Sequence, residues 1–169
     1  MTPNPTIRLQ SILQTLEHVI FPAVDPKNSL AQEQCGLVLG QLGMLIRHMP
    51  YFGEYHALCF DDLADTVAGL PAHEGGSVST QASTALQEKL AETRAEDDPL
   101  TAFHALGHAL EEYLRALADD GDPACRKTVE AKALAFSRRQ SVRSRAWFKD
   151  AGFDHAPDEL PSLEEMLGR

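Results

Sequence analysis

Residues 29–49 read SLAQEQCGLVLGQLGMLIRHM, and the spacing of the apolar residues in this stretch decides the fold class. Apolar residues recur at alternating steps of four and three, which is the period of one face of an α-helix in a helical bundle. They are Ala31, Cys35, Val38, Leu42, Leu45 and Met49. Ser29 and Gln32 have the spacing of a capping box, which predicts that the helix begins at Ser29. Pro50 has no backbone N–H to donate, so it predicts the end of the helix.

The same helical period recurs along the rest of the chain, and no segment alternates apolar and polar residues as a half-buried strand does. Further helices are predicted at residues 6–21, 54–70, 80–95, 98–119 and 122–149. The sequence leaves open whether 29–70 is one kinked helix or two. Short connections favour antiparallel neighbours, so we predict an all-α, antiparallel up-and-down bundle. Its four core helices are expected at 6–21, 29–49, 98–119 and 122–149, with 54–70 and 80–95 at the periphery.

Length and composition restrict the class of protein. A chain of 169 residues fits one domain, so we predict a single helical-bundle domain over 1–169, with 150–169 as a semi-ordered C-terminal tail. The net charge of −10 argues against binding to nucleic acid or to an anionic membrane. The first residues, MTPNPTIRLQ, lack the pattern of a secretory signal. The three cysteines have no CxxC spacing, which predicts reduced thiols and a cytoplasmic location.

Two histidines lie one helical turn apart in residues 103–114, FHALGHALEEYL. At this spacing His104 and His108 can share a metal ion, and Glu111 can add a carboxylate. Metal sites in bundles draw further ligands from facing helices, and His48 is a candidate for that role. The chain has no Glu-x-x-His motif. We therefore predict that the two histidines lie at the boundary between core and solvent and that no cofactor is bound. A divalent metal or acid–base catalysis remains the alternative.

Glycines interrupt two apolar helix faces, and each costs about 1 kcal/mol relative to alanine in a helix. One reason for such glycines is close approach of neighbouring helices. The other is a ligand pocket between the helices at 29–49 and 98–119. The residues that would line this pocket are Gly36, Gly40, Gly43, Phe103 and Gly107.

Positive charge is concentrated at residues 126–149, which contain eight basic residues and one acidic residue, Glu130. The apolar face also stops at residues 137–145, SRRQSVRSR, where Val142 is the one apolar residue. Arginine and tryptophan are enriched at protein–protein contacts, so this end of the helix is a candidate partner-binding surface. Its residues are Arg138, Arg139, Arg143, Arg145, Trp147 and Phe148.

No glycine-rich phosphate loop and no nucleophile elbow is present in the sequence. We therefore predict a non-catalytic accessory or protein-interaction bundle that self-associates, as a homodimer, through the basic end of the helix at 122–149. The expected partner is a second copy or another acidic protein, with no nucleic acid and no membrane. The alternative is a bundle, possibly an enzyme, that binds a small molecule or a metal between the helices at 29–49 and 98–119.

Overall fold

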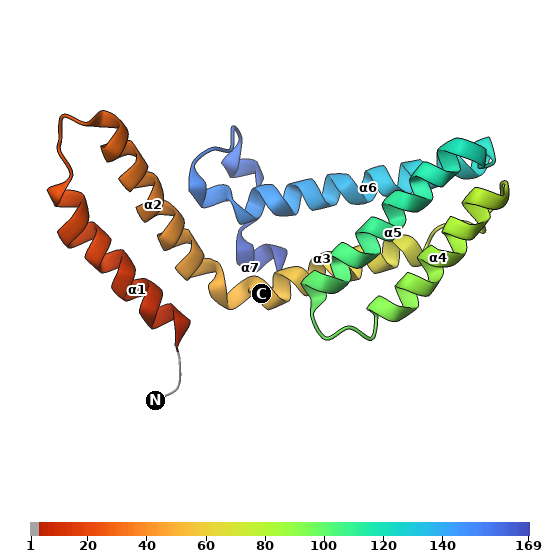
Figure 1. Cartoon of the computed structure of the whole chain (residues 1–169), viewed down its shortest axis with the longest axis horizontal. Coiled ribbons are helices and arrows are strands. Elements are labelled where there is room, and N and C mark those ends of the chain that lie inside the picture. The colour runs from red at the N-terminus through yellow and green to blue at the C-terminus, as the bar shows by residue number, and fades with distance from the viewer. Residues whose placement is uncertain (1–3) are drawn as a thin grey trace. The chain divides into compact units, whose positions relative to one another are not determined.

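The computed structural model describes residues 4–169, and it confirms the all-α class, with no β-strand within those residues (Figure 1). The α-helices are α1 (Pro5–Thr15), α2 (Ser29–His48), α3 (Phe52–Ala68), α4 (Ser77–Thr93), α5 (Pro99–Asp120), α6 (Pro123–Trp147) and α7 (Leu163–Met166). The stretch 29–70 is thus two α-helices, joined by a 3-10 turn at Met49–Tyr51. None of the helices between residues 4 and 169 is long and apolar enough to span a membrane.

Residue contacts divide the chain into two units, which are described one at a time. The first contains the chain up to Phe52 together with Trp147–Glu159, and the second contains Gly53–Ala146 together with Leu160–Arg169. In the first unit α1 and α2 run side by side as an antiparallel pair, which we call the hairpin (Figure 1).

The helical path of α1 changes its pitch before the turn of the hairpin. Leu16–Ile20 form a π-helical turn, in which the N–H of Phe21 donates to the carbonyl of Leu16, and Phe21–Ala23 form a 3-10 turn. Pro22 lies within this segment and has no N–H to continue the α-helical pattern. The extra residue in the π turn widens the helix locally, a feature that is frequent at functional sites.

α2 begins at Ser29 as predicted, but its cap differs from the predicted one. Asn28, rather than Ser29, is the N-cap residue, and its side chain accepts a hydrogen bond from the N–H of Ala31. The amide of Gln32 donates instead to the carbonyl of Val24. The predicted capping box at this position was therefore wrong, because asparagine one residue earlier is an equally strong cap.

The core of the second unit corrects the prediction of which helices are central. All four helices α3, α4, α5 and α6 contribute to one buried apolar cluster, whereas no residue of α1 is buried. The cluster comprises Leu63, Ala64, Val67, Leu86, Leu90, Leu106, Leu110, Tyr113, Leu117, Cys125 and Val129. The weak apolar pattern of α4 is sufficient because Leu86 and Leu90 both enter this cluster.

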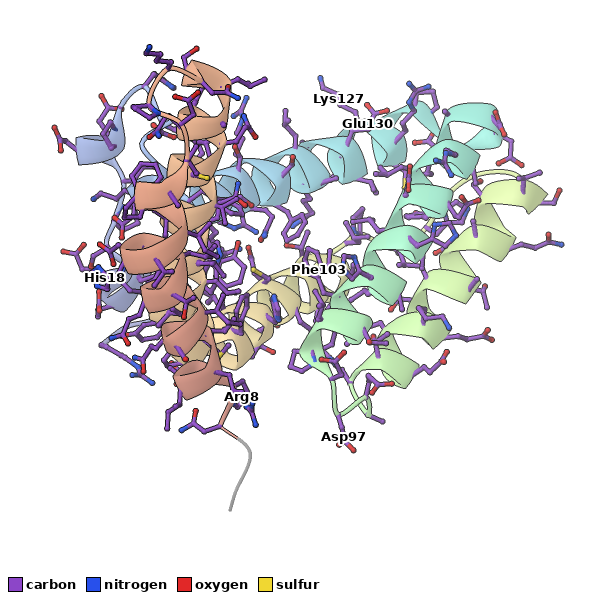
Figure 2. All side chains as sticks on the ribbon, turned by 60° about the vertical axis from the view of Figure 1, so that its left-hand side comes forward. Arg8, His18, Asp97, Phe103, Lys127 and Glu130 are labelled. Atoms are coloured by element: carbon purple, nitrogen blue, oxygen red, sulfur yellow. The ribbon has the colours of Figure 1, made fainter. Side chains whose placement is uncertain are left out.

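The buried face of α5 is centred on Leu106 and Tyr113, which are among the most buried side chains, while Leu100 is exposed. Asp98 caps α5, with its carboxylate accepting from the N–H groups of Leu100 and Thr101. Figure 2 shows Asp97 in the turn from α4 to α5, and Phe103 soon after α5 begins.

The start of α4 is capped by a residue from the far end of α5. The carboxylate of Asp120 accepts hydrogen bonds of 2.9 Å from the N–H groups of Val78 and Ser79. Its backbone carbonyl accepts from the N–H of Gly76, and Gly75 and Gly121 form an isolated β-bridge. The end of α5 is therefore tied directly to the beginning of α4.

The C-terminal segment contains a capping box. Ser162 accepts from the N–H of Glu165, and Glu165 accepts from the N–H of Ser162, at the start of α7. Arg169 pairs with Glu54 of α3.

Candidate functional site

The hairpin exposes an unusual amount of apolar side chain. Leu30 is 66% exposed, Val19 64% and Ile7 61%, and four more large apolar residues of residues 4–52 are exposed. Those four are Ile12, Ile20, Leu37 and Val38. Scattered exposed apolar residues are normal on a protein surface, but seven on two paired helices require an explanation.

Four of these side chains lie in two rows along the hairpin. Ile12, Leu16 and Ile20 follow one another at steps of four along the first helical segment, and Leu30, Gln34 and Val38 do the same along α2. Steps of four place residues on one side of a helix. Leu37 flanks the second row, because it lies next to Val38 and seven residues after Leu30. We call the two rows together with Leu37 the hairpin face; it holds five of the seven exposed apolar side chains, and Ile7 and Val19 lie outside it.

Both rows lead into a groove between α1 and α2. Its volume is about 180 Å³, and it is lined by Leu16, Ile20, Phe21, Gln34, Cys35, Val38 and Leu39. The π turn at Leu16–Ile20 supplies two of these residues. The groove is therefore apolar apart from the Gln34 amide and the Cys35 thiol, and it suits an aliphatic side chain or a small apolar molecule.

Charge is scarce and balanced on this part of the chain. Residues 4–52 carry three basic residues and three acidic residues, so their net charge is zero, although the whole chain carries −10. The six residues are Arg8, Glu17, Asp25, Lys27, Glu33 and Arg47. Figure 2 shows Arg8 projecting from α1 and His18 from the π turn. None of the residues of the hairpin face is ionisable.

The end of α2 is anchored by a buried aromatic contact. His48, 4% exposed, lies against Trp147, which also contacts Phe52 at 5.1 Å between ring centroids. The Nδ1 atom of His48 is buried without a hydrogen-bond partner within residues 4–169. Burial lowers the pKa of His48, and the charge of Arg47 lowers it further, which outweighs the opposite effect of Asp150. The ring is therefore neutral near pH 7.

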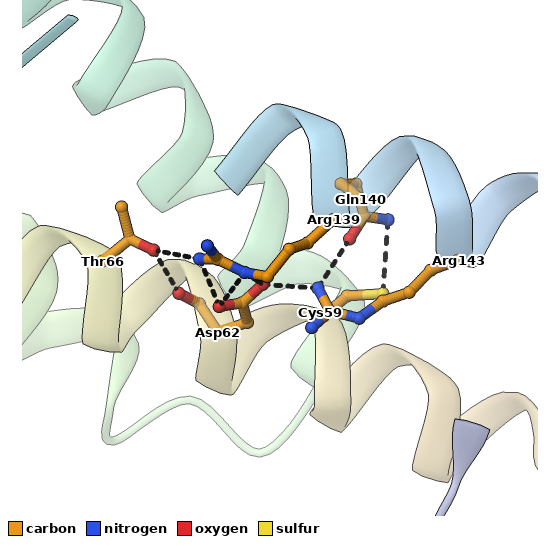
Figure 3. A network of polar contacts seen from close by, with 6 residues as sticks. All are labelled: Cys59, Asp62, Thr66, Arg139, Gln140 and Arg143. Carbon is orange, nitrogen blue, oxygen red and sulfur yellow. Dashed lines mark hydrogen bonds and ion pairs between the residues drawn. The ribbon is translucent and has the colours of Figure 1, made fainter. Parts of the chain in front are cut away.

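In the second unit, Asp62 of α3 is held by two arginines of α6 (Figure 3). Arg139 donates to Asp62 through Nε and through Nη2, at 2.7 Å for the latter, and Arg143 donates through Nη1 at 2.5 Å. Arg139 also donates to the hydroxyl of Thr66, and Gln140 donates to the thiol of Cys59. At residues 137–145 α6 has no apolar face, and this polar network makes its contact with α3 there instead.

The network fixes the charge of Asp62. Burial alone would raise the pKa of this carboxyl group, but hydrogen bonds from Arg139 and Arg143 and their positive charges lower it below its ordinary value. One carboxylate is held by two guanidinium groups, so the cluster is an ion-paired contact between α3 and α6 with a net charge of +1.

A second polar group is enclosed in the same unit. The hydroxyl of Tyr113 and Nδ1 of His73 are 3.1 Å apart, and burial together with neighbouring Cys125 raises the pKa of Tyr113 to about 12. Tyr113 is buried, as is Cys125, whose thiol faces the carbonyl of Ala72. A reactant from solvent has no access to the phenol, so this group stabilises the core.

The glycines of the predicted ligand pocket lie in different units. Gly36, Gly40 and Gly43 belong to α2, where a Cβ atom on Gly36 or Gly40 would meet nothing within 4 Å. Gly107 lies on α5, and a Cβ atom there would be 3.9 Å from Leu63, which is an ordinary contact. Phe103 lies against Phe136. A pocket formed by these five residues stays a prediction.

A metal site formed by His48 with His104, His108 and Glu111 stays a prediction, because His48 belongs to the first unit and the other three residues to the second. His104 and His108 are exposed, and Glu111 forms an ion pair with Arg115. Within residues 4–169, no group of three or more histidine, cysteine, aspartate or glutamate side chains is placed to hold a metal ion.

The predicted partner-binding residues are used in different ways. Arg139 and Arg143 bind Asp62, and Trp147 is buried against His48. Arg145 also takes part in an interaction within the chain. Arg138 and Phe148 are exposed. Binding of a partner at this end of α6 stays a prediction.

Sequence reasoning missed the hairpin face. The apolar pattern of residues 29–49 was assigned to a core, although the same pattern fits a helix whose apolar side is open. The low charge of residues 4–52 was the signal that could have shown the difference, because charge depletion is typical of the centre of an interface. No protein-family model, no curated protein and no solved structure matches this chain.

Proposed function

We propose that this chain is a non-catalytic protein-interaction module whose contact surface is the hairpin face. The single observation that carries the proposal is the exposure of large apolar side chains on α1, α2 and the π turn between them, five of which lie on the hairpin face. An exposed, charge-free apolar patch next to a groove is the signature of a binding surface. The second unit has its own closed core and is a scaffold in this proposal.

Other parts of the chain support a non-catalytic role. The carboxylate of Asp62 is held by Arg139 and Arg143, and Tyr113 is buried. The basic end of α6 was the surface expected from the sequence. Two of its arginines and Trp147 are engaged within the chain, so we assign the contact to the hairpin face instead.

Site-specific photocrosslinking inside cells tests this proposal. A benzoylphenylalanine at Leu30 should form a covalent adduct with a protein, either another copy of this chain or a different one. The same probe at Leu134, which is exposed on α6, is the matched control and should give no adduct. Equal yields at both positions, or no adduct at Leu30, would contradict the assignment.

The groove favours a second candidate function, which is binding of a small apolar molecule. The groove has room for an aliphatic group, and its wall is apolar where Ile20, Val38 and Leu39 line it. Native mass spectrometry of the purified protein tests this function directly. A bound molecule that is lost in a Val38→Trp variant, which fills the groove, would support it, and the mass of the bare chain alone would refute it.

A further inference from the structure

The hairpin cannot bury its own apolar surface. Two paired helices bury one side of each helix against the other, and a bundle needs further helices to cover the rest. In the hairpin every residue of α1 remains at least partly exposed, and α2 buries His48 alone. Two more helices with an apolar side are therefore required to complete a four-helix arrangement.

The hairpin face carries both a protruding part and a receiving part. Leu30 projects at one end of its row, and Val38, at the other end of the same row, lines the groove. The first helical segment repeats this arrangement. Ile20 lines the groove, and Ile12 lies two turns away from it. A surface that holds both a projection and a recess can fit a copy of itself across a twofold axis.

Electrostatics favour a second copy over a highly charged partner. The whole chain carries a net charge of −10, so two copies repel one another overall. The hairpin adds nothing to this repulsion, because its three positive and three negative charges cancel and none lies on the hairpin face. Two hairpins can approach without net repulsion, whereas a basic partner would find no excess of negative charge here.

From these three observations we propose that the hairpin face binds the hairpin face of a second copy, so that α1 and α2 of both copies form an intermolecular four-helix bundle. In this dimer Leu30 of each copy packs toward the groove of the other, beside Val38 and Cys35. The proposal rests on the proposed function and names its partner. It also accounts for the π turn, which opens the groove at Leu16 and Ile20.

Sedimentation velocity of the purified full-length chain from about 1 to 100 μM tests the dimer, because an apolar interface of standard size gives affinities in or below this range. The wild-type chain should sediment as a dimer at the upper end. The double variant Leu30→Glu, Val38→Glu should weaken dimerisation at least tenfold. A matched variant with the same added charge on α6, Leu134→Glu, should remain a dimer.

A thiol probe covers the case in which the double variant fails to fold. Cys35 lines the groove, while Cys59 and Cys125 are buried within the second unit. Maleimide labelling of Cys35 in the wild-type chain should slow at least tenfold between low and high protein concentration. Labelling that is independent of concentration, in a chain with its native circular dichroism, would overturn the proposal.

The outcomes separate this inference from the proposed function. A monomer at 100 μM, combined with a cellular adduct between position 30 and a different protein, would overturn the inference that the partner is a second copy. It would still support the proposed function as an interaction module. A monomer without any adduct would refute both. A dimer that is unchanged by Leu30→Glu, Val38→Glu would also overturn the inference, because the contact would then lie elsewhere.

Discussion

The imidazole ring of His48 lies edge-on to the indole ring of Trp147, with 4.9 Å between the ring centroids and 69° between the ring planes. Edge-to-face pairs of this kind add about 0.5–1.5 kcal/mol beyond the area that they bury. His48 ends α2, and Trp147 begins the segment of the first unit that extends to Glu159. This contact, together with the ion pair between Arg47 and Asp150, therefore joins the C-terminal part of that unit to the hairpin.

We expect the His48–Trp147 contact to weaken in mild acid. The pKa of His48 is lowered by burial in the folded chain, so the unfolded chain takes up the proton first. The stabilisation is fully present above pH 6.5, the ordinary value for histidine, and is lost as the pH falls through the folded pKa. Trp147 is the only tryptophan, so its fluorescence in urea at pH 7.5 and at pH 5 measures the effect.

His48→Phe keeps an aromatic ring against Trp147 and removes the proton. Its urea midpoint should depend less on pH than that of the wild-type chain. His155→Gln is the control, because the His155 side chain is largely exposed and its loss should leave the profile unchanged. If His48→Phe retains the wild-type profile, His48 is not the titrating group.

Loss of the Asp62 carboxylate should destabilise the second unit. Asp62→Asn leaves Arg143, whose side chain is 15% exposed, without its anionic partner. We expect the free energy of unfolding to fall by about 2 kcal/mol at pH 7, between the values for exposed and fully buried pairs. Because the pKa of Asp62 is lowered by folding, the difference from wild type should shrink once the pH drops below about 4.

Chemical denaturation at pH 7 and at pH 3 provides the measurement. Asp61→Asn is the matched control, since Asp61 is the adjacent residue, carries the same charge and is exposed. A loss of stability that is equal in the two variants would mean that net charge, and not the contact with Arg139 and Arg143, is responsible.

Gly107→Ala should stabilise the second unit by about 0.5–1 kcal/mol. The added Cβ atom would meet Leu63 at an ordinary 3.9 Å, so the helix gains alanine's propensity without a clash. Gly121→Ala is the opposing control, because its Cβ atom would lie 2.7 Å from the carbonyl oxygen of Leu117. Thermal unfolding compares the two variants. A destabilising Gly107→Ala would show that α5 needs more room at this position than the structure gives it.

Removal of both exposed histidines of α5 should have little effect. The double variant His104→Ala, His108→Ala should keep the unfolding free energy within about 0.5 kcal/mol of wild type, as surface substitutions do. Zinc should raise the melting temperature of neither protein, because no three-ligand group is present within residues 4–169. A rise with zinc in wild type, lost in the double variant, would restore the metal hypothesis.

The sequence predicts where the helices lie along the chain better than it predicts which helices pack against one another. Asp98-Pro99 marks the start of α5 to the residue, because the cap and the proline act locally. Periodicity, however, identifies an apolar side and not what covers it. For that reason α2 was assigned to the core, and α4 was called peripheral although Leu86 is fully buried. The Asp62–Arg139 pair spans 77 residues, and no local signal reports a contact between residues so far apart.

The cap that Asp120 provides to α4 also has a consequence for local unfolding. The first N–H groups of α4 are bonded at the last turn of α5, and the β-bridge of Gly75 and Gly121 closes the same end. Neither helix can fray there without releasing the other. We therefore expect the amide hydrogens of Val78 and Ser79 to exchange with solvent together with those at the end of α5, at one common rate, so that α4 and α5 open as a single cooperative segment.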